Sequence, residues 1–183
     1  MAKFYDELDD FLTKFIAEQK IFFTATAPAN GRLNLSPKGM DTFRVLSSTQ
    51  VSFMNLTGSG NETAAHLAEN GRLTIMFCSF TEKPLILRLY GTGKAVHPRD
   101  EAWAELAPLF PESVGNRQVI LMDIESIQSA CGFAVPFYEY QGEREQLTRW
   151  TVNQGEEGIQ TYWENRNQVS IDGQPTFLLE EAA

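Results

Sequence analysis

A glycine-rich stretch carries the residues best suited to bind an anion. It has the sequence Thr57-Gly58-Ser59-Gly60-Asn61-Glu62-Thr63, follows a predicted strand and opens a predicted helix. The free backbone N–H groups at the start of a helix can bind a phosphate. Ser59 and Glu62 also have the spacing of a capping box, in which the two side chains satisfy the helix start internally. From this stretch alone, anion binding and helix capping both remain open, and the spacing favours the capping role for Glu62.

Two basic residues lie where they could contact a phosphate or a flavin. Lys38 ends a predicted strand in the sequence Ser36-Pro37-Lys38-Gly39, where the alternative is an exposed lysine in a turn. Arg88 lies within the apolar strand Ile86-Leu87-Arg88-Leu89-Tyr90. Because arginine is rarely buried without a partner, Arg88 needs either a carboxylate or a ligand phosphate.

Histidines, serines and cysteines give no further catalytic signal. His66 and His97 lack a metal-ligand neighbour at a useful spacing, so we interpret both as structural and expect no metal site. The serines lack the context of a nucleophile elbow. Cys78 and Cys131 stand in apolar surroundings and are expected to be free, buried thiols. No residue is assigned a catalytic role.

Length and charge narrow the class of protein. The 183 residues fit one domain, and the formal net charge of −9 argues against binding to nucleic acid or to an anionic membrane surface. No apolar run approaches the length of a membrane span, and the N-terminal residues lack the pattern of a secretory signal. We therefore expect a cytoplasmic protein.

Hydrophobic periodicity predicts mostly short strands. Helices are expected over residues 4–19, from the glycine-rich turn to about residue 69, over 98–110, and over 143–166 with interruptions at Gly155 and Gly158. Strands are expected over residues 21–26, 32–36, 43–47, 50–56, 73–80, 85–96 and 119–126. Such close spacing with few crossover helices favours an antiparallel barrel over a doubly wound sheet. The prediction is a mainly β, single domain of residues 1–183, with a barrel over about 20–130 and a helical extension over about 131–183.

Three stretches, in this order of elements, resemble the FMN-binding split-barrel family related to pyridoxamine 5′-phosphate oxidase. They are residues 32–39, 53–67 and 87–93. The resemblance covers about residues 10–130 and implies an antiparallel, Greek-key split barrel that binds FMN between the two subunits of a homodimer. The cofactor-binding residues that it implies are Arg32, Ser36, Lys38, Gly39, Asn55, Gly58, Ser59, Asn61, Thr63 and Arg88.

The chain departs from the oxidases at the phosphate site. Where the oxidases have Ser-Arg-Lys, this chain has Asn61-Glu62-Thr63, so two positive charges are lost and one negative charge is gained. A phosphate would then depend on Lys38, on backbone N–H groups and on the polar side chains of the glycine-rich turn. The oxidase glutamine on the following strand falls at Ile86, and the oxidases' C-terminal substrate-binding motif has no counterpart that we can place.

The function expected from the resemblance is that of an FMN-dependent oxidoreductase acting on an unknown small molecule. The flavin would carry the redox chemistry and the protein would position it. One alternative is another cofactor on the same barrel, such as a deazaflavin or haem. The other is a cofactor-free dimeric binding module that lost its phosphate site through Glu62. Apolar residues beyond the needs of one barrel favour a dimer with a large apolar interface, and include Phe133, Val135, Phe137 and Tyr138.

Overall fold

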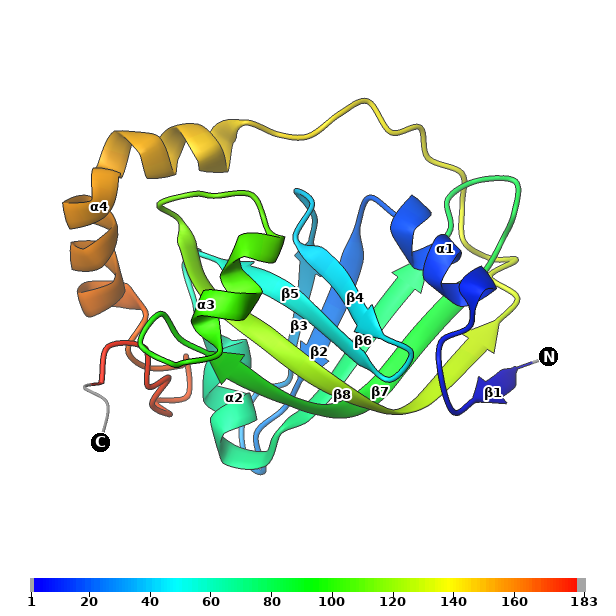
Figure 1. The fold of residues 1–183 in the computed structure, drawn as a ribbon, viewed down its shortest axis with the longest axis horizontal. Helices are drawn as coiled ribbons and strands as arrows, with labels where there is room; N and C mark the ends of the chain where they lie inside the picture. The colour runs from blue at the N-terminus through cyan, green and yellow to red at the C-terminus, as the bar shows by residue number, and fades with distance from the viewer. Residues whose placement is uncertain (1, 181–183) are drawn as a thin grey trace.

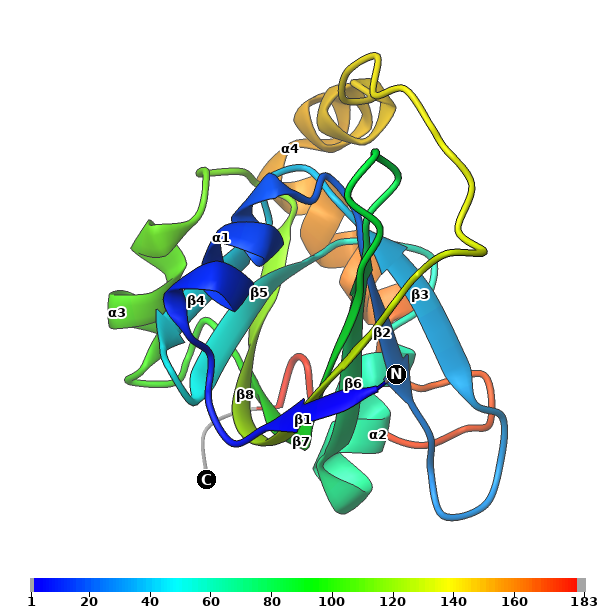
Figure 2. The same ribbon diagram turned by 90° about the vertical axis from the view of Figure 1, so that its right-hand side faces the viewer.

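One long antiparallel sheet, curved into an open barrel, forms the body of the molecule (Figure 1). The computed structural model describes residues 2–180. The strands are β1 (Lys3–Tyr5), β2 (Phe22–Thr26), β3 (Asn34–Lys38), β4 (Phe43–Ser47), β5 (Gln50–Leu56), β6 (Arg72–Cys78), β7 (Ile86–Val96) and β8 (Asn116–Ala130). They pair in the order β3-β2-β6-β7-β8-β5-β4, and β1 pairs with β8. Within the described residues no ladder joins β3 to β4, so the barrel is split there (Figure 2).

Four helices flank this sheet in the described chain. They are α1 (Asp10–Glu18), α2 (Glu62–Asn70), α3 (Trp103–Leu106) and α4 (Gln146–Arg166). The predicted fold class, a mainly β antiparallel split barrel with flanking helices, is confirmed. In the part of the chain that the structure covers, no helix has the length and apolar character needed to cross a bilayer.

Two predicted helices are shorter than expected. Residues 4–19 divide into β1 and α1, because the Asp9 side chain caps α1 by accepting a hydrogen bond of 2.7 Å from the Leu12 N–H. Residues 98–110 form only α3 and a following 3₁₀ turn, Ala107–Leu109. Strand β8 is longer than the predicted 119–126 and begins at Asn116, which places Arg117 inside the sheet.

Aromatic side chains fill the core beneath α1. The apolar face of α1 buries Leu12, Phe15 and Ile16 in the main core cluster. Phe43 packs edge-on against Phe22 and Phe77, with ring centroids 5.0 Å apart in both pairs. Such edge-to-face pairs contribute beyond the area that they bury. This packing fixes β2 and β4, which flank β3 along the chain.

The chain after β8 departs from the barrel before it returns. It runs as an extended segment over residues 131–145 and then forms α4, which bends sharply in Figure 1. The bend lies at Gly155, whose φ of 65° and ψ of −179° suit glycine alone. The predicted interruption is therefore confirmed at Gly155, whereas Gly158 continues the helix. The expectation of two buried thiols is wrong for Cys131, which is exposed because β8 ends one residue earlier; Cys78 is buried, and both are free.

Candidate functional site

A pocket of about 700 Å³ lies between β3, the start of α2 and the segment that follows α4. Its volume lies in the range of small-molecule sites, about 300–1,000 Å³. Eight of the ten residues predicted to bind a cofactor line it, namely Arg32, Ser36, Lys38, Asn55, Gly58, Ser59, Asn61 and Thr63. Gly39 lines a neighbouring pocket of about 490 Å³ instead, and Arg88 lines neither of these two pockets.

Strand alternation brings one row of β3 side chains to this pocket. Asn34, Ser36 and Lys38 are two residues apart, so they share one face of the strand, and all three line the pocket. Ser36 Oγ donates to Asn34 Oδ1 at 3.1 Å. Asn34 Nδ2 in turn donates to Thr63 Oγ1 at 3.3 Å, in the first turn of α2. These bonds hold β3 against the glycine-rich turn, although 29 residues separate Asn34 from Thr63.

Lys38 extends into a polar part of the pocket. Its Nζ donates a hydrogen bond of 3.0 Å to Asn55 Oδ1 and lies 5.9 Å from the centre of the Phe53 ring, a cation–π distance. Burial, and then the nearby charge of Arg117, lowers the pKa of Lys38 to about 8. The ammonium is therefore held close to a second cation without a balancing carboxylate bonded to it.

Arg117 is the principal residue of this pocket that the sequence did not reveal. It is 2% exposed, and its guanidinium donates to the Gly60 carbonyl at 3.0 Å and to Asn167 Oδ1 at 2.8 Å. Burial lowers its pKa to about 9, so it is charged at neutral pH. Its Nε is buried without a hydrogen-bond partner. A basic residue at the edge of an apolar strand was the available signal, but the predicted strand began two residues later.

The pocket has an excess of positive charge and of donors. The ion pairs of the described residues are Arg32–Asp172, Arg44–Asp41 and Arg149–Glu145. Neither Lys38 nor Arg117 therefore pairs with a carboxylate in residues 2–180. Asn61 Nδ2, like Arg117 Nε, is buried and unpartnered. Because buried charges and donors are costly unless they are compensated, this arrangement suits an anion.

The predicted capping box at the start of α2 is wrong. The N-cap residue is Asn61, not Ser59, and no side chain caps the helix. Glu62 turns to the C-terminal segment, where both of its carboxylate oxygens accept from the Ile171 N–H, at 3.1 and 3.0 Å. The spacing of Ser59 and Glu62 was suitable, but a backbone donor 109 residues away takes the carboxylate. The start of α2 is thus left without a side-chain cap beside the pocket.

The end of α4 and the segment that follows it form one wall of the pocket. Arg166, Val169, Ser170 and Ile171 contribute to the lining. The wall is anchored where Asn167 Nδ2 donates to the Gly58 carbonyl at 3.1 Å. Two further contacts, from Trp163 Nε1 to Thr57 Oγ1 at 2.8 Å and between Arg32 and Asp172, hold the wall on either side. No local pattern in the sequence indicated this wall.

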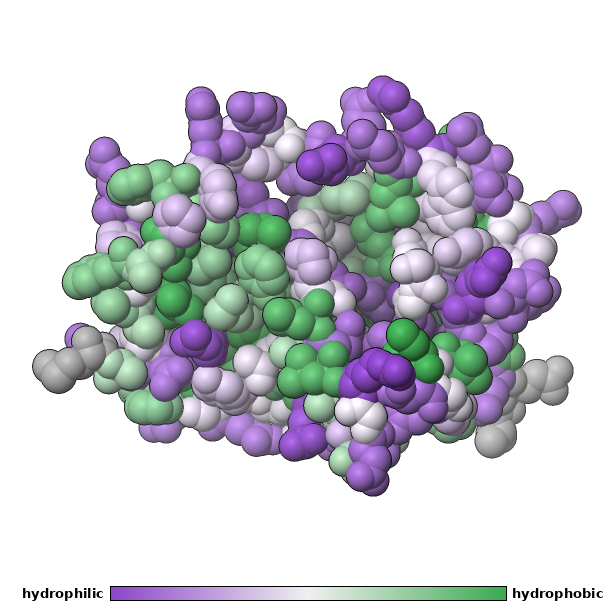
Figure 3. Space-filling view, turned by 180° about the vertical axis from the view of Figure 1, so that it is seen from behind, coloured by the Kyte–Doolittle hydropathy of each residue, from purple (hydrophilic) through white to green (hydrophobic). Residues whose placement is uncertain are grey.

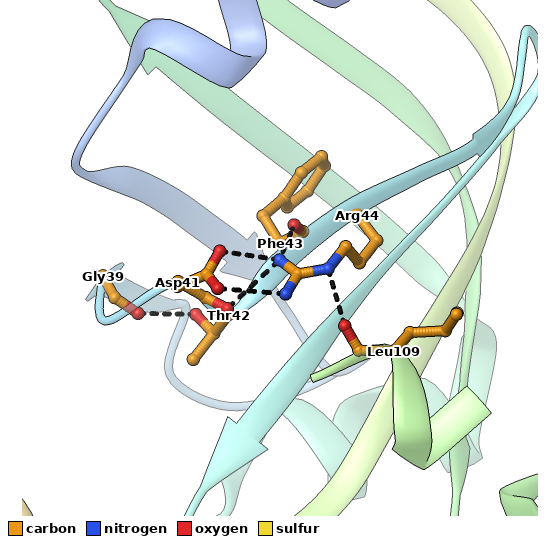
Figure 4. Close-up of polar contacts among 6 residues, drawn as sticks. All are labelled: Gly39, Asp41, Thr42, Phe43, Arg44 and Leu109. Carbon is orange, nitrogen blue, oxygen red and sulfur yellow. Dashed lines mark hydrogen bonds and ion pairs between the residues drawn. The ribbon is translucent and has the colours of Figure 1, made fainter. Parts of the chain in front are cut away.

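A strained turn fixes the end of β3. Met40 and Asp41 have left-handed φ angles of 63° and 55°, which residues other than glycine seldom adopt. Figure 4 shows how Arg44 holds this turn: two guanidinium nitrogens contact the Asp41 carboxylate at 2.8 and 3.1 Å, and Nε donates to the Leu109 carbonyl at 2.7 Å. Thr42 Oγ1 also donates to the Gly39 carbonyl at 2.6 Å. The turn thus fixes the backbone immediately after Lys38.

A family model described as pyridoxamine 5′-phosphate oxidase matches residues 8–131. The chain belongs to the pyridoxamine 5′-phosphate oxidase family. It is 38% identical to a family member, ustO of Aspergillus flavus, over 96% of this chain and 78% of that protein.

Two solved structures show the same fold at low identity. A single-residue variant of HupZ from Group A Streptococcus aligns with a TM-score of 0.54 and 20% identity, over 67% of this chain and 98% of that one. A protein described as a possible pyridoxamine 5′-phosphate oxidase, from Lactobacillus delbrueckii, aligns with a TM-score of 0.53 and 19% identity, over 67% of this chain and 94% of that one. At this identity the two structures bear on the fold alone.

Arg88, which the resemblance to the pyridoxamine 5′-phosphate oxidase family also indicated, lies apart from the pocket of this chain. It is paired across the sheet with Met76 on β6 and Gln128 on β8, and it is half-buried. Its neighbours in sequence, Leu87 and Leu89, are fully buried in the core. Strand alternation therefore places Arg88 on the outer face of the split barrel.

Proposed function

We propose that this chain is an FMN-binding member of its family, with an oxidoreductase function on a small molecule, and that the pocket holds the flavin phosphate. The observation that carries the proposal is a pair of cations, the half-buried Lys38 and the buried Arg117, which share one pocket and have no carboxylate partner among residues 2–180. A phosphate monoester carries a charge between −1.5 and −2 at about pH 7 and offers three strong acceptor oxygens. Such a ligand would balance both charges.

The other groups of the pocket fit the same ligand. Asn61 Nδ2 and Arg117 Nε are unused donors, and the uncapped start of α2 adds backbone N–H groups. Arg117 brings in from β8 a positive charge that the glycine-rich turn lacks. Glu62, the acidic residue that opposes an anion here, is engaged by the Ile171 N–H. The loss of the oxidase Ser-Arg-Lys pattern is thus partly compensated by a residue from another strand.

The roles of this chain's residues in that function are to bind and to orient. A bound flavin supplies the two-electron chemistry, and the protein supplies its position and surroundings. Lys38 and Arg117 would fix the phosphate, while the Asn34–Thr63 contact keeps the two sides of the pocket together. The wall around Ile171 would separate the phosphate end from solvent.

Titration with three ligands tests the proposal. We expect FMN to bind more tightly than riboflavin, which has the same ring system without the phosphate, and flavin to be released when the purified protein is denatured. FAD tests whether the pocket accepts a pyrophosphate, in which the flavin phosphate carries a second substituent. Equal affinities for riboflavin and FMN would contradict a phosphate site, and binding of no flavin would favour the cofactor-free alternative. A deazaflavin or haem spectrum in the purified protein would identify the other alternative.

We also propose that the protein is a homodimer, formed through the outer face of β3, β2, β6 and β7. Phe23, Met76 and Arg88 lie in one row across this face by their strand pairing. Pro37 continues this row on β3, and Leu35, two residues away on the same face of that strand, is 62% exposed. Figure 3, viewed from the side of β3, shows apolar residues gathered in patches on this side of the molecule. Contiguous exposed apolar surface of this kind commonly marks an interface.

A further inference from the structure

A chain of buried side-chain hydrogen bonds runs from His97 to the pocket. Gln118 Nε2 lies 3.4 Å from His97 Nδ1, and Gln118 Oε1 accepts from Asn55 Nδ2 at 3.2 Å. Asn55 Nδ2 also donates to Asn61 Oδ1 at 3.2 Å, and Asn55 Oδ1 accepts from Lys38 Nζ at 3.0 Å. All but Lys38 are at most 7% exposed, so water cannot substitute freely for these bonds.

The direction of every hydrogen bond between Lys38 and His97 follows from the Lys38 ammonium group. An ammonium group can only donate, so the atom of Asn55 that faces it must be the amide oxygen. The Asn55 nitrogen then faces Gln118 and Asn61, and each of them must present its oxygen to it. Gln118 is left with its nitrogen toward His97. The His97 Nδ1 must therefore be an unprotonated acceptor, and the proton of the neutral ring belongs on Nε2.

His97 is suited to this role. Burial, and then the charge of Arg99, lowers its pKa to about 4, against an opposing effect of Asp100. The ring is therefore neutral at physiological pH and keeps a lone pair on Nδ1. A protonated His97 would set a donor against the Gln118 amide nitrogen. To avoid that clash Gln118 would have to turn over, which would then set its nitrogen against that of Asn55.

We infer that His97 and Gln118 are positioning residues that hold the Asn55 and Asn61 amides in the orientation that Lys38 requires, and so keep the donor polarity of the anion pocket, meaning that hydrogen-bond donors face the anion. The inference rests on the proposed function for the identity of the anion. With the hydrogen bonds in this direction, the Asn61 side-chain oxygen faces Asn55, and the Asn61 side-chain nitrogen is left unpartnered. Lys38 and Arg117 can only donate, so the fixed side chains at this end of the pocket offer hydrogens. Neither His97 nor Gln118 lines the pocket itself.

The histidine tautomer gives a test that needs no ligand. The chain contains only two histidines, so the ring nitrogens of His97 can be assigned by ¹⁵N NMR with His97→Asn as the reference. We expect the Nε2–H tautomer, with Nδ1 unprotonated, at neutral pH. A proton on Nδ1 would reverse the required polarity and overturn the inference.

Binding measurements on variants give the second test. Gln118→Met removes the amide at similar length, and His97→Leu removes the acceptor. We expect each to weaken FMN binding about tenfold while leaving riboflavin binding unchanged, since a lost charge-assisted contact is of that size. His97→Asn can place an amide oxygen near the position of Nδ1 and should restore most of the FMN affinity.

A matched control separates polarity from stability. Val119 follows Gln118 in the sequence but is fully buried in a separate apolar cluster. Val119→Ala therefore opens a cavity in that cluster and leaves the Gln118 amide in place. It should lower the melting temperature without changing the ratio of FMN to riboflavin affinity. If Gln118→Met shifts that ratio no more than Val119→Ala does, the inference fails. If the wild-type protein binds no flavin, the proposed function fails. The His97 tautomer then still decides whether His97 and Gln118 are positioning residues of the pocket.

Discussion

Glu62, the first residue of α2, binds the backbone N–H of Ile171 through both of its carboxylate oxygens, at 3.1 and 3.0 Å. The contact joins the helix start to the wall of the pocket across 109 residues of sequence. A negative charge that would repel a phosphate thereby acquires a structural partner. Its electrostatic effect and its anchoring effect can be separated by two substitutions.

Glu62→Gln should retain the wall and improve FMN binding. Glutamine keeps one carbonyl oxygen for the Ile171 N–H but carries no charge, so we expect a gain of about 0.5–1 kcal/mol in FMN binding at low salt, as for one partly screened charge. Glu62→Ala also removes the charge but releases the N–H. Limited proteolysis should therefore cut the segment around Ile171 faster in Glu62→Ala than in Glu62→Gln or the wild type. Indifference of FMN affinity to both substitutions would place the phosphate elsewhere.

Lys38→Ala should weaken FMN binding by about 1.5–3 kcal/mol, as expected for the loss of a charge-assisted hydrogen bond. Riboflavin should bind the variant and the wild type alike, because the contact is to the phosphate. Fluorescence titration of both ligands measures the difference. Lys94→Ala, at an exposed lysine of β7, is the matched control for a loss of charge. An equal loss for FMN and riboflavin would mean that Lys38 does not contact the phosphate.

The pH dependence of FMN binding should follow the lowered pKa of Lys38, which is about 8 in the folded protein. As the pH rises through 8 the ammonium loses its proton, so FMN affinity should fall by up to about tenfold per pH unit. Titrations between about pH 7 and pH 9.5, with riboflavin and Lys38→Ala as controls, measure this slope. A flat profile for the wild type would contradict the contact.

The lowered pKa of Lys38 also affects the stability of the ligand-free protein, which should change with pH in the direction opposite to FMN affinity. An unfolded lysine titrates near pH 10.4, so between about pH 8 and pH 10.4 the unfolded chain binds more protons than the folded one. The free energy of unfolding of the ligand-free protein should therefore rise with pH across this window through Lys38. Chemical denaturation of the wild type and Lys38→Ala at several pH values isolates that contribution.

Leu35→Glu should dissociate the proposed homodimer without unfolding the subunit. Leu35 is 62% exposed, so its replacement costs a single subunit little, whereas a carboxylate buried in an apolar interface is strongly unfavourable. Light scattering at micromolar concentration should give a dimer for the wild type and a monomer for the variant. Val152→Glu, at the 68% exposed Val152 of α4, is the control. A monomeric wild type would contradict the proposed dimer.

The parts of the site that the sequence predicted are local in the chain. Ser36 and Lys38 alternate along one strand, and Gly58 to Thr63 form a turn and the start of α2, so their neighbourhood is encoded within a few residues. The resemblance to a known family then placed these two stretches in one site. The antiparallel barrel was predictable for the same reason, because it follows from short strands at close spacing.

The remaining parts depend on contacts between distant segments. Arg117 meets Gly60 across 57 residues and Asn167 across 50, and neither contact leaves a periodic signal. The capping-box prediction failed in the same way, because the spacing of Ser59 and Glu62 carries no information about the Ile171 N–H. Tertiary donors of this kind compete with local ones, and only the folded chain determines which of them prevails.

The anchoring of the pocket wall also has a consequence for biosynthesis. The lining combines residues 32–63, Arg117 and residues 166–171. A nascent chain that has folded its barrel on the ribosome still lacks Ile171 and its neighbours until translation has passed them. A ligand of this pocket therefore meets a complete site only after residues 166–171 have been synthesised and have docked against the barrel.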